Sequence, residues 1–448
     1  MSSKSKSTTS LRLVAGGALL VGSTGGAALL SGVAGAQSVE PDGVAPQSTF
    51  APQSTFTVAN TNDSGAGSLR QAVLDANANA GADTITFDPS VTGTITLTSG
   101  EIAITDSVTI TGPGSANLAI SGNDTSRIFS ATASGTAVAI SGLSFVHGAT
   151  PAWNGQWSDW TATGGAIFVS GASISLDHVA MSNNASSRNG GGLSAFNASS
   201  VSVTASTFTS NSSGNGGGAI NLYGGGAATF DAVTVTGNTL TGIGTPYQYG
   251  GGGIRTGSNS STTITRSTFS GNTVSNTPAG AGGGGAYLGA WSGPVVVEGC
   301  TFDANSAAEG SGLMIWSGTA TVANSTFTAN IASRPEPNSH GGALTVGGVF
   351  GGGLTKILQS TISGNTSSSG NVSGLVVKRR TDRGPLAVHL YGTVVAGNTG
   401  GPDVGFPDIW FPGFPPPTAM NDFTLNASNS VIGSIKATTP FTNVSGNQ

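Results

Sequence analysis

One repeated pattern dominates residues 164–398 and limits what this chain can fold into. Each repeat contains a glycine run, a short apolar strand, a turn, a strand that alternates Ser or Thr with apolar residues, and a closing Ser/Thr-Phe-x-x-Asn signature or a close variant of it. A repeat of 25 to 35 residues is too short to bury its own apolar face, whereas stacked repeats bury a continuous core. The closing asparagines, 25 to 35 residues apart, are Asn184, Asn211, Asn238, Asn272, Asn305, Asn330, Asn365 and Asn398.

The pattern predicts an all-β fold, a right-handed parallel β-helix of the pectate-lyase-like type. Asparagines at one turn of every coil can join their amides into a ladder, and Asn tolerates the left-handed conformation of a sharp turn. Glycine makes up 72 of the 448 residues, and its runs suit a second corner where a Cβ would obstruct close backbone approach. Calcium-binding β-rolls also contain glycine runs, but Asp does not follow the glycines at a fixed offset here.

The regions outside the repeats predict export and a capped solenoid. Basic residues, then an apolar stretch and Ala34-Gly35-Ala36, are typical of a secretory signal with its cleavage site; a membrane anchor is the alternative. A capping box at 68–71 precedes an apolar helical face formed by Leu69, Ala72, Val73 and Ala76. The expected regions are a signal peptide (1–36), a Pro/Gln/Ser linker (37–56), an N-terminal cap with a short helix (57–83), the β-helix (84–435) and a C-terminal tail (436–448).

Composition argues against several classes of function. A net charge of −5 supplies no basic field for nucleic acid, and no apolar run after the signal is long enough to span a membrane. The single cysteine, Cys300, aligns with a row of serines and is expected to be a small packed residue. The four histidines fall in separate coils, so we expect no metal site and no cofactor. We expect a monomer.

The N-terminal region also resembles a known family. The segment contains Asn60-Thr61-Asn62-Asp63-Ser64-Gly65, Gly67-Ser68-Leu69-Arg70-Gln71-Ala72 and Gly81-Ala82-Asp83-Thr84-Ile85-Thr86-Phe87. These residues resemble the CSLREA-type segment of bacterial secreted right-handed β-helix proteins, the polymorphic-outer-membrane-protein-like or choice-of-anchor group, with Gly67 where the family has Cys. The resemblance spans about residues 57–435 and implies an exported surface or matrix protein. It implies no catalytic set.

Aligning the coils on their asparagines places outward residues in rows, and two carboxylates share one row. Asp177 and Asp231 are two coils apart, about 10 Å at ~4.8 Å per coil, with Thr204 between them. This spacing is marginal for an inverting glycosidase, which needs about 6.5–9.5 Å. They are the weak catalytic candidates, and solvated strand ends are the competing interpretation. The basic run 378–383 is expected to be a solvated turn.

Long loops at one turn of the coil collect aromatic residues. The loops 149–163, 239–249, 273–281, 331–340 and 399–418 should project from one edge of the solenoid. Exposed rings there suit a stacking platform for sugars or a protein contact, although they can instead pack each loop onto its coil. The candidate ligand-binding residues are Trp153, Trp157, Trp160, Tyr247, Tyr249 and Trp410.

These observations favour a secreted or surface-associated, non-catalytic, adhesin-like protein. Its expected partner is an extracellular polysaccharide or a cell-surface protein. One alternative is a polysaccharide lyase or glycoside hydrolase that acts in a groove on the β-helix. Another takes the Ser/Thr rows as an ice-binding or purely structural surface.

Overall fold

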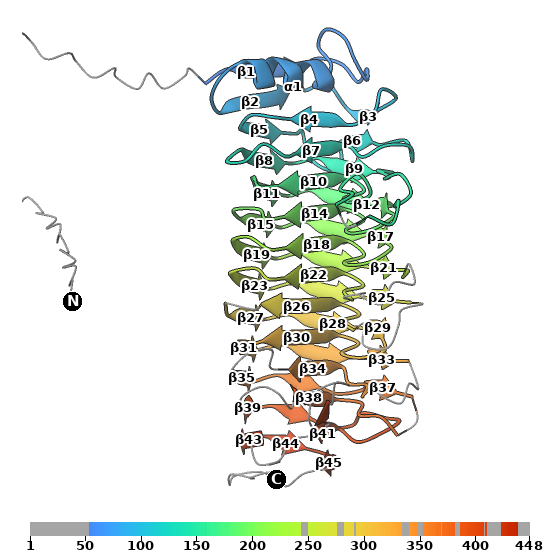
Figure 1. Ribbon diagram of the computed structural model, residues 1–448, viewed down its shortest axis with the longest axis vertical. Coiled ribbons are helices and arrows are strands. Elements are labelled where there is room, and N and C mark those ends of the chain that lie inside the picture. The colour runs from blue at the N-terminus through green and yellow to red at the C-terminus, as the bar shows by residue number, and fades with distance from the viewer. Residues whose placement is uncertain are drawn as a thin grey trace, which may run out of the picture. The chain divides into compact units, whose positions relative to one another are not determined.

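Successive coils stack so that each strand pairs in parallel with its equivalent in the next coil, and the fold is the predicted right-handed parallel β-helix (Figure 1). The computed structural model describes residues 53–156, 158–242, 250–275, 282–290, 293–333, 340–347, 353–368, 370–380, 386–406, 408–409 and 423–437. A complete coil contributes one strand to each of four parallel sheets, here called A to D. The chain passes through them in the order C, A, B, D, as it does from β10 (Ile167–Ser170) to β13 (Ala185–Ser186).

Four sheets, A to D, form the sides of the solenoid. Sheet A contains β1 (Thr55–Val58), β2 (Asp83–Phe87), β5 (Val108–Thr111), β8 (Ala137–Ser141), β11 (Ser173–Asp177), β15 (Val201–Thr204), β19 (Ala227–Asp231), β23 (Ser261–Thr265), β27 (Val295–Glu298), β31 (Thr319–Ala323), β35 (Gly353–Leu358), β39 (Leu386–Tyr391) and β43 (Phe423–Ser428). Sheet B contains β3 (Gly93–Thr96), β6 (Leu118–Ser121), β9 (Ser144–Val146), β12 (Ala180–Ser182), β16 (Thr207–Thr209), β20 (Thr234–Thr236), β24 (Thr268–Ser270), β28 (Thr301–Asp303), β32 (Thr326–Thr328), β36 (Thr361–Ile362), β40 (Val394–Val395) and β44 (Val431–Ile432).

The other two sides differ in strand length. Sheet C contains β4 (Ile102–Ile104), β7 (Phe129–Ala131), β10 (Ile167–Ser170), β14 (Leu193–Phe196), β18 (Ile220–Tyr223), β22 (Ile254–Gly257), β26 (Ala286–Ala290), β30 (Leu313–Ser317), β34 (Leu344–Gly347), β38 (Leu375–Arg380), β41 (Val404–Phe406) and β45 (Ile435–Ala437), with β42 (Asp408–Ile409) also pairing with β38. Sheet D contains β13 (Ala185–Ser186), β17 (Ser212–Ser213), β21 (Thr239–Leu240), β25 (Thr273–Val274), β29 (Ser306–Ala307), β33 (Ile331–Ala332) and β37 (Thr366–Ser367).

Sheet D corrects one expectation about the loops. Residues 239–240, 273–274 and 331–332 were assigned to projecting loops, but they are strands of sheet D. Each of these strands has two residues, which is too short for a period-two pattern to emerge from the sequence.

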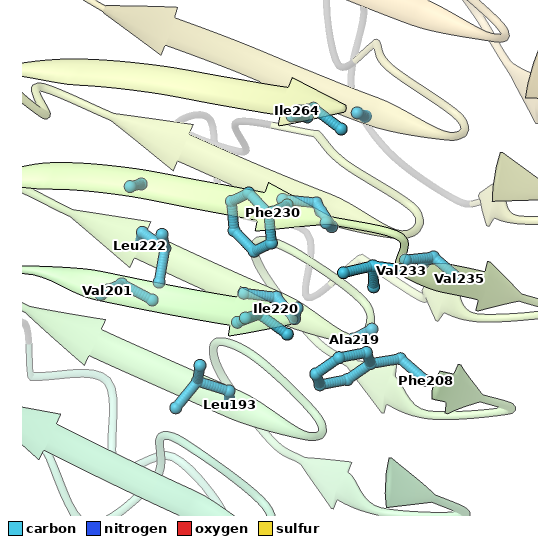
Figure 2. Packing of buried hydrophobic residues seen from close by; sticks show 14 of the residues in the cluster. Leu193, Val201, Phe208, Ala219, Ile220, Leu222, Phe230, Val233, Val235 and Ile264 are labelled. Carbon is cyan, nitrogen blue, oxygen red and sulfur yellow. The ribbon is translucent and has the colours of Figure 1, made fainter. Parts of the chain in front are cut away.

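Apolar side chains that point inward from the strands fill the interior of the solenoid (Figure 2). Alternation along each strand sends every second residue into the core. The ring centroids of Phe269 and Phe302 are 4.8 Å apart, and Phe302 and Phe327 repeat that spacing. Identical side chains in the same row therefore stack from coil to coil at the strand spacing.

The ladder asparagines from Asn184 to Asn365 lie buried where sheet B turns into sheet D, and Asn398 is half-buried. In Asn238, both the main-chain N–H and Nδ2 donate to Asn272 Oδ1, at 3.0 and 2.9 Å. Nδ2 also donates to the Phe208 carbonyl, 2.9 Å away. Equivalent bonds join each ladder asparagine to the next, from Asn184 through to Asn398. Asn398 then donates to Asp403 Oδ1.

The left-handed turn conformation is not taken by the ladder asparagines, which differs from the expectation from the sequence. It falls on the residue before each ladder asparagine, for example Asn183 (φ 56°) and Ala304 (φ 52°), and not on the asparagine itself. The asparagine must point its amide inward to the next coil, so its neighbour makes the sharp change of direction. The glycine corner is as expected: a Cβ on Gly217 would lie 1.9 Å from the Ile220 carbonyl oxygen.

A short helix covers the first coil. The helix α1 (Leu69–Ala78) begins after Ser68, whose Oγ accepts from the main-chain N–H of Gln71 at 3.1 Å. Its buried residues are the predicted Leu69, Ala72, Val73 and Ala76, and it packs on β1, β2 and β4 (Figure 1). The Gln71 side chain bonds Asp75, so only half of the capping box forms. The first strand begins at Thr55, two residues inside the expected linker.

Cys300 lies in the hydroxyl row formed by Ser267, Ser325 and their equivalents. Its N–H donates to Ser325 Oγ and its Sγ donates to the Glu298 carbonyl. Burial raises the pKa of the Cys300 thiol to about 11.

Because the thiolate is the reactive form, we expect the Cys300 thiol of the native protein to resist labelling by a maleimide at pH 8, and that of the urea-unfolded protein to label fully. Fast labelling of the native protein would contradict this placement. The free energy of unfolding of Cys300→Ser should lie within about 1 kcal/mol of that of the parent.

Candidate ligand-binding site

The outer face of sheet C carries polar and aromatic residues although its strands begin with core residues. In β14, Leu193 and Ala195 point into the core, so Ser194 and Phe196 point outward. The register then aligns Ser194, Asn221 and Arg255 in one outward row and Phe196 with Tyr223 in the next. Loop residues that precede sheet C fold over this face, and the first outward row is therefore mostly buried.

A cavity of about 250 Å³ opens on this face between β14 and β22. Residues from four coils and one loop contribute to it. The described lining residues are Trp160, Arg188, Asn189, Ser194, Phe196, Asn215, Asn221, Tyr223 and Arg255. Its volume is slightly smaller than the usual range for ligand pockets, ~300–1,000 Å³.

Aromatic rings form one wall of the pocket as a column along the solenoid axis. The Trp160 ring lies 4.3 Å from the Phe196 ring, centroid to centroid, and 6.1 Å from the Phe168 ring. Phe196 stacks on Tyr223 at 5.8 Å with an interplanar angle of 10°. The column holds Trp160 against sheet C and so fixes the end of the 149–163 loop over the pocket.

Two guanidinium groups line the same pocket and are almost fully buried. Arg188 is 4% exposed, and its guanidinium carbon lies 5.3 Å from the Trp160 ring centroid. Arg255 is 5% exposed, lies 5.4 Å from the Tyr223 centroid and donates from Nη1 to Asn221 Oδ1 at 2.8 Å. Burial lowers the pKa of Arg188 from its ordinary value and the nearby Asp159 partly offsets this; arginine stays charged throughout.

Neutral hydrogen-bonding groups complete the lining. Asn221 Nδ2 donates to Ser194 Oγ, and Asn215 Nδ2 donates to Asn189 Oδ1, over 3.5 and 3.4 Å. Asn215 is 3% exposed, and its Oδ1 accepts no hydrogen bond from the residues that the structure describes. A buried amide oxygen of this kind is suited to a ligand donor such as a hydroxyl group.

The aromatic residues predicted from the loops divide into two groups. Trp160 lines the pocket, and Trp153 lies beside it with Arg188 5.7 Å from its ring and its Nε1 donating to Gln156 O. Trp157, Tyr247, Tyr249 and Trp410 lie outside the described residues. Sequence reasoning missed the contribution of the sheet. The alternation in Leu193-Ser194-Ala195-Phe196 and Ile220-Asn221-Leu222-Tyr223 was the available signal.

The two weak catalytic candidates lie on sheet A, outside the lining of this pocket. The register places Asp177 beside Thr204 and Thr204 beside Asp231, which is the expected row. Asp177 contacts His178 at the surface, 2.9 Å away. Asp231 forms an ion pair with Arg266 and accepts from Thr265 Oγ1. The hydrogen bonds from Arg266 and then Thr265 hold the pKa of Asp231 below its ordinary value, so it is unsuited to donate a proton at neutral pH.

A second charged cluster occurs on the sheet C side, in later coils. Glu309 and Lys378, which are 1% and 3% exposed, form a close ion pair, and the His340 N–H donates to Glu309 Oε1 at 3.1 Å. Burial alone raises the pKa of Glu309, but hydrogen bonds from His340 and the charge of Lys378 outweigh it and hold that pKa below its usual value. The expected solvated turn at 378–383 is wrong at its start, because Lys378 to Arg380 extend β38 and Lys378 is buried.

No group of three or more His, Cys, Asp or Glu side chains is placed to hold a metal ion within the part of the chain that the structure describes. Over the same residues, no helix has the length and apolar character needed to cross a bilayer.

Comparison with known proteins places the chain in a family. Residues 73–374 match the model of a family described as a right-handed beta helix region. This match covers more than half of the chain, and the chain therefore belongs to that family of right-handed β-helix proteins. No curated protein matches the sequence.

Several solved structures are similar at low identity. The A-module of the mannuronan C-5 epimerase AlgE4 from Azotobacter vinelandii is 11% identical, with 87% of this chain and 99% of that chain covered and a TM-score of 0.43. Pectate lyase Pel9A is 15% identical (89% and 79% covered, TM-score 0.33). The catalytic unit of the GH87 α-1,3-glucanase from Streptomyces thermodiastaticus is 16% identical (89% and 70% covered, TM-score 0.35). Likeness at this level says nothing of ligand or activity.

Proposed function

We propose that this protein is an exported, non-catalytic binding protein whose ligand is a carbohydrate, held in the pocket on the outer face of sheet C. One observation carries the proposal: the pocket combines aromatic rings with buried amide, hydroxyl and guanidinium groups from separate coils. An apolar wall with a few convergent polar groups is the usual composition of a small-ligand site. Asn215 Oδ1 supplies an acceptor for a sugar hydroxyl, and Ser194 and Asn221 supply further hydrogen-bonding groups.

We propose further that the protein is secreted or surface-associated and adhesin-like. The signal-like segment 1–36 supports export, and the CSLREA-type residues in the N-terminal cap support membership of the secreted surface group. The alternative of a polysaccharide lyase or hydrolase stays a competing proposal. The described lining contributes groups that bind and orient a ligand, and we therefore favour binding over cleavage.

A glycan array tests this function with a matched pair of variants. We expect the protein to bind a subset of glycans, and Tyr223→Ala to weaken that binding about tenfold or more, because it removes a pocket wall and the ring beside Arg255. Tyr391→Ala is the control: Tyr391 is a similarly exposed tyrosine (42% against 36%) at the end of a sheet A strand.

Three results of the array and a parallel cleavage assay have distinct meanings. Equal binding by both tyrosine variants would contradict the proposed site. An array without bound glycans would contradict carbohydrate binding. New reducing ends or unsaturated products released from a bound glycan would favour the enzymatic alternative.

A further inference from the structure

The glycine run 216–218 contains one glycine that the backbone does not need. Gly217 and Gly218 form the tight corner, and a Cβ there would lie 1.9 and 2.0 Å from main-chain carbonyl oxygens. Gly216 differs from both, because its φ lies outside the left-handed region that favours glycine. The three atoms nearest to a Cβ on Gly216 all belong to side chains, which can move more easily than the backbone.

Equivalent positions of the two preceding coils carry side chains. Parallel bridges align Thr163 with Asn189, and Asn189 with Gly216. The following coil has Gly250 at this position, but that residue takes a φ of 85° and needs glycine for its own conformation. The stacking of coils therefore accepts a threonine or an asparagine here, and it does not explain the glycine at 216.

A notch lies where the side chain of Gly216 would be, among residues that line the pocket. The missing Cβ would lie 2.9 Å from Arg255 Cδ, 3.2 Å from Asn221 Oδ1 and 3.4 Å from Asn189 Oδ1. These three residues come from three successive coils, and all of them line the cavity. The absence of a side chain at 216 therefore leaves a small space between the pocket residues.

Hydrogen-bond acceptors border this notch. An amide oxygen has two lone pairs, and the bonds among the described residues use one on each of two oxygens: Asn215 Nδ2 donates to Asn189 Oδ1, and Arg255 Nη1 donates to Asn221 Oδ1. The buried Oδ1 of Asn215, the residue before Gly216, accepts no hydrogen bond from the described residues. This part of the lining is therefore suited to a ligand group that donates a hydrogen bond.

We infer that Gly216 is a specificity-determining residue: its missing side chain leaves room for one hydroxyl group of the bound sugar, which donates to the amide oxygen of Asn189 or Asn221. A hydroxyl group has a single non-hydrogen atom, so it fits a space that a Cβ would fill, and it carries the proton that the acceptors require. This inference rests on the proposed function and specifies which group of the ligand the notch receives.

Gly216→Ala tests the notch by filling it. The added methyl group requires only a shift of the flexible Arg255 side chain, so the variant should melt within about 2 °C of the parent. Its binding to the array glycans should weaken about tenfold or more, because the methyl group and the sugar hydroxyl cannot occupy the same space. The array carries both neutral and acidic oligosaccharides, and thermal unfolding is measured alongside it.

Gly289→Ala is the matched control. Gly289 lies in β26 of the same sheet, its φ is also outside the left-handed region, and a Cβ on it would lie 3.2 Å from the Thr256 carbonyl oxygen. It is not among the described residues that line the pocket. This variant should therefore bind the array glycans as the parent does.

Gly216→Ser tests the preference for a hydroxyl group without any ligand. The serine Oγ can donate to the same amide oxygens, so this variant should melt about 1–2 °C above Gly216→Ala. It should also lose binding to the array glycans, because the protein's own hydroxyl group then occupies the notch.

The outcomes separate this inference from the proposed function. Parent-like glycan binding by Gly216→Ala would overturn the inference, and so would a Gly216→Ser protein that melts no higher than Gly216→Ala. A Gly216→Ala protein that melts well below the parent would show that the backbone needs glycine there, which also overturns it. In each of these cases glycan binding by the parent still supports the proposed function. An array without bound glycans contradicts the proposed function and, with it, the role of Gly216 in specificity.

Discussion

Replacing Asn272 with alanine should destabilise the protein by about 3 kcal/mol or more. Asn272 Oδ1 accepts from the N–H and Nδ2 of Asn238, while its own Nδ2 donates to Asn305 Oδ1 and the Val235 carbonyl. All of these groups are buried, and each one left without a partner costs about 1–3 kcal/mol. The midpoint of urea unfolding, followed by circular dichroism, measures the effect.

The ladder variant has a direct control in an exposed asparagine. Asn62 lies on the surface of the N-terminal region, so Asn62→Ala should change the free energy of unfolding by less than about 0.5 kcal/mol. A loss in Asn272→Ala no larger than in Asn62→Ala would show that the ladder does not hold the coils together. Because each coil contacts only its neighbours, the break should also increase hydrogen exchange locally, in β20, β24 and β28.

Replacing Lys378 with methionine should cost about 3–5 kcal/mol. The change leaves the Glu309 carboxylate buried without its cation, and an uncompensated buried charge is among the most destabilising defects in a protein. The measurement is again the urea midpoint at pH 7. The pKa of Glu309 lies below its usual value in the folded state, so its contribution is present above its unfolded pKa of ~4.3 and is lost as pH falls through the folded pKa.

Two further variants distinguish the buried charge from other causes. Glu309→Gln/Lys378→Met removes both charges and should recover a large part of the stability lost in Lys378→Met. Asp231→Asn breaks an exposed pair with Arg266 and should cost less than about 1 kcal/mol. If Lys378→Met and Asp231→Asn have equal small effects, the Glu309–Lys378 pair is not buried as described.

Much of the fold was predictable because it repeats. The same residue types recur at equivalent positions of successive coils. Asn at one turn and Gly at another therefore identify the corners even where one repeat is irregular. The outward row Asp177, Thr204, Asp231, aligned from the sequence, occurs in the structure with that register. Sheet D and the residue that takes the left-handed turn were missed, because two-residue strands and single dihedral angles leave no periodic signal.

The candidate site was only partly predictable because it does not repeat. Trp160 was recognised as an aromatic loop residue, but Arg188 and Arg255 are single departures from the repeat at different positions of their coils. Nothing in their local sequence indicates that they line one cavity. The strands of sheet C resemble core strands in sequence, so their outward-facing side chains were not recognised as part of a site. Loop residues bury these side chains in the folded protein.

The amino-acid sequence alone determined the solenoid, its two tight corners and its helical cap, because local spacing controls which residues enter the core and which make the turns. Only the tertiary structure decided where the candidate pocket lies. Coil stacking at the strand spacing brings residues nearly 100 positions apart, from Trp160 to Arg255, into one pocket.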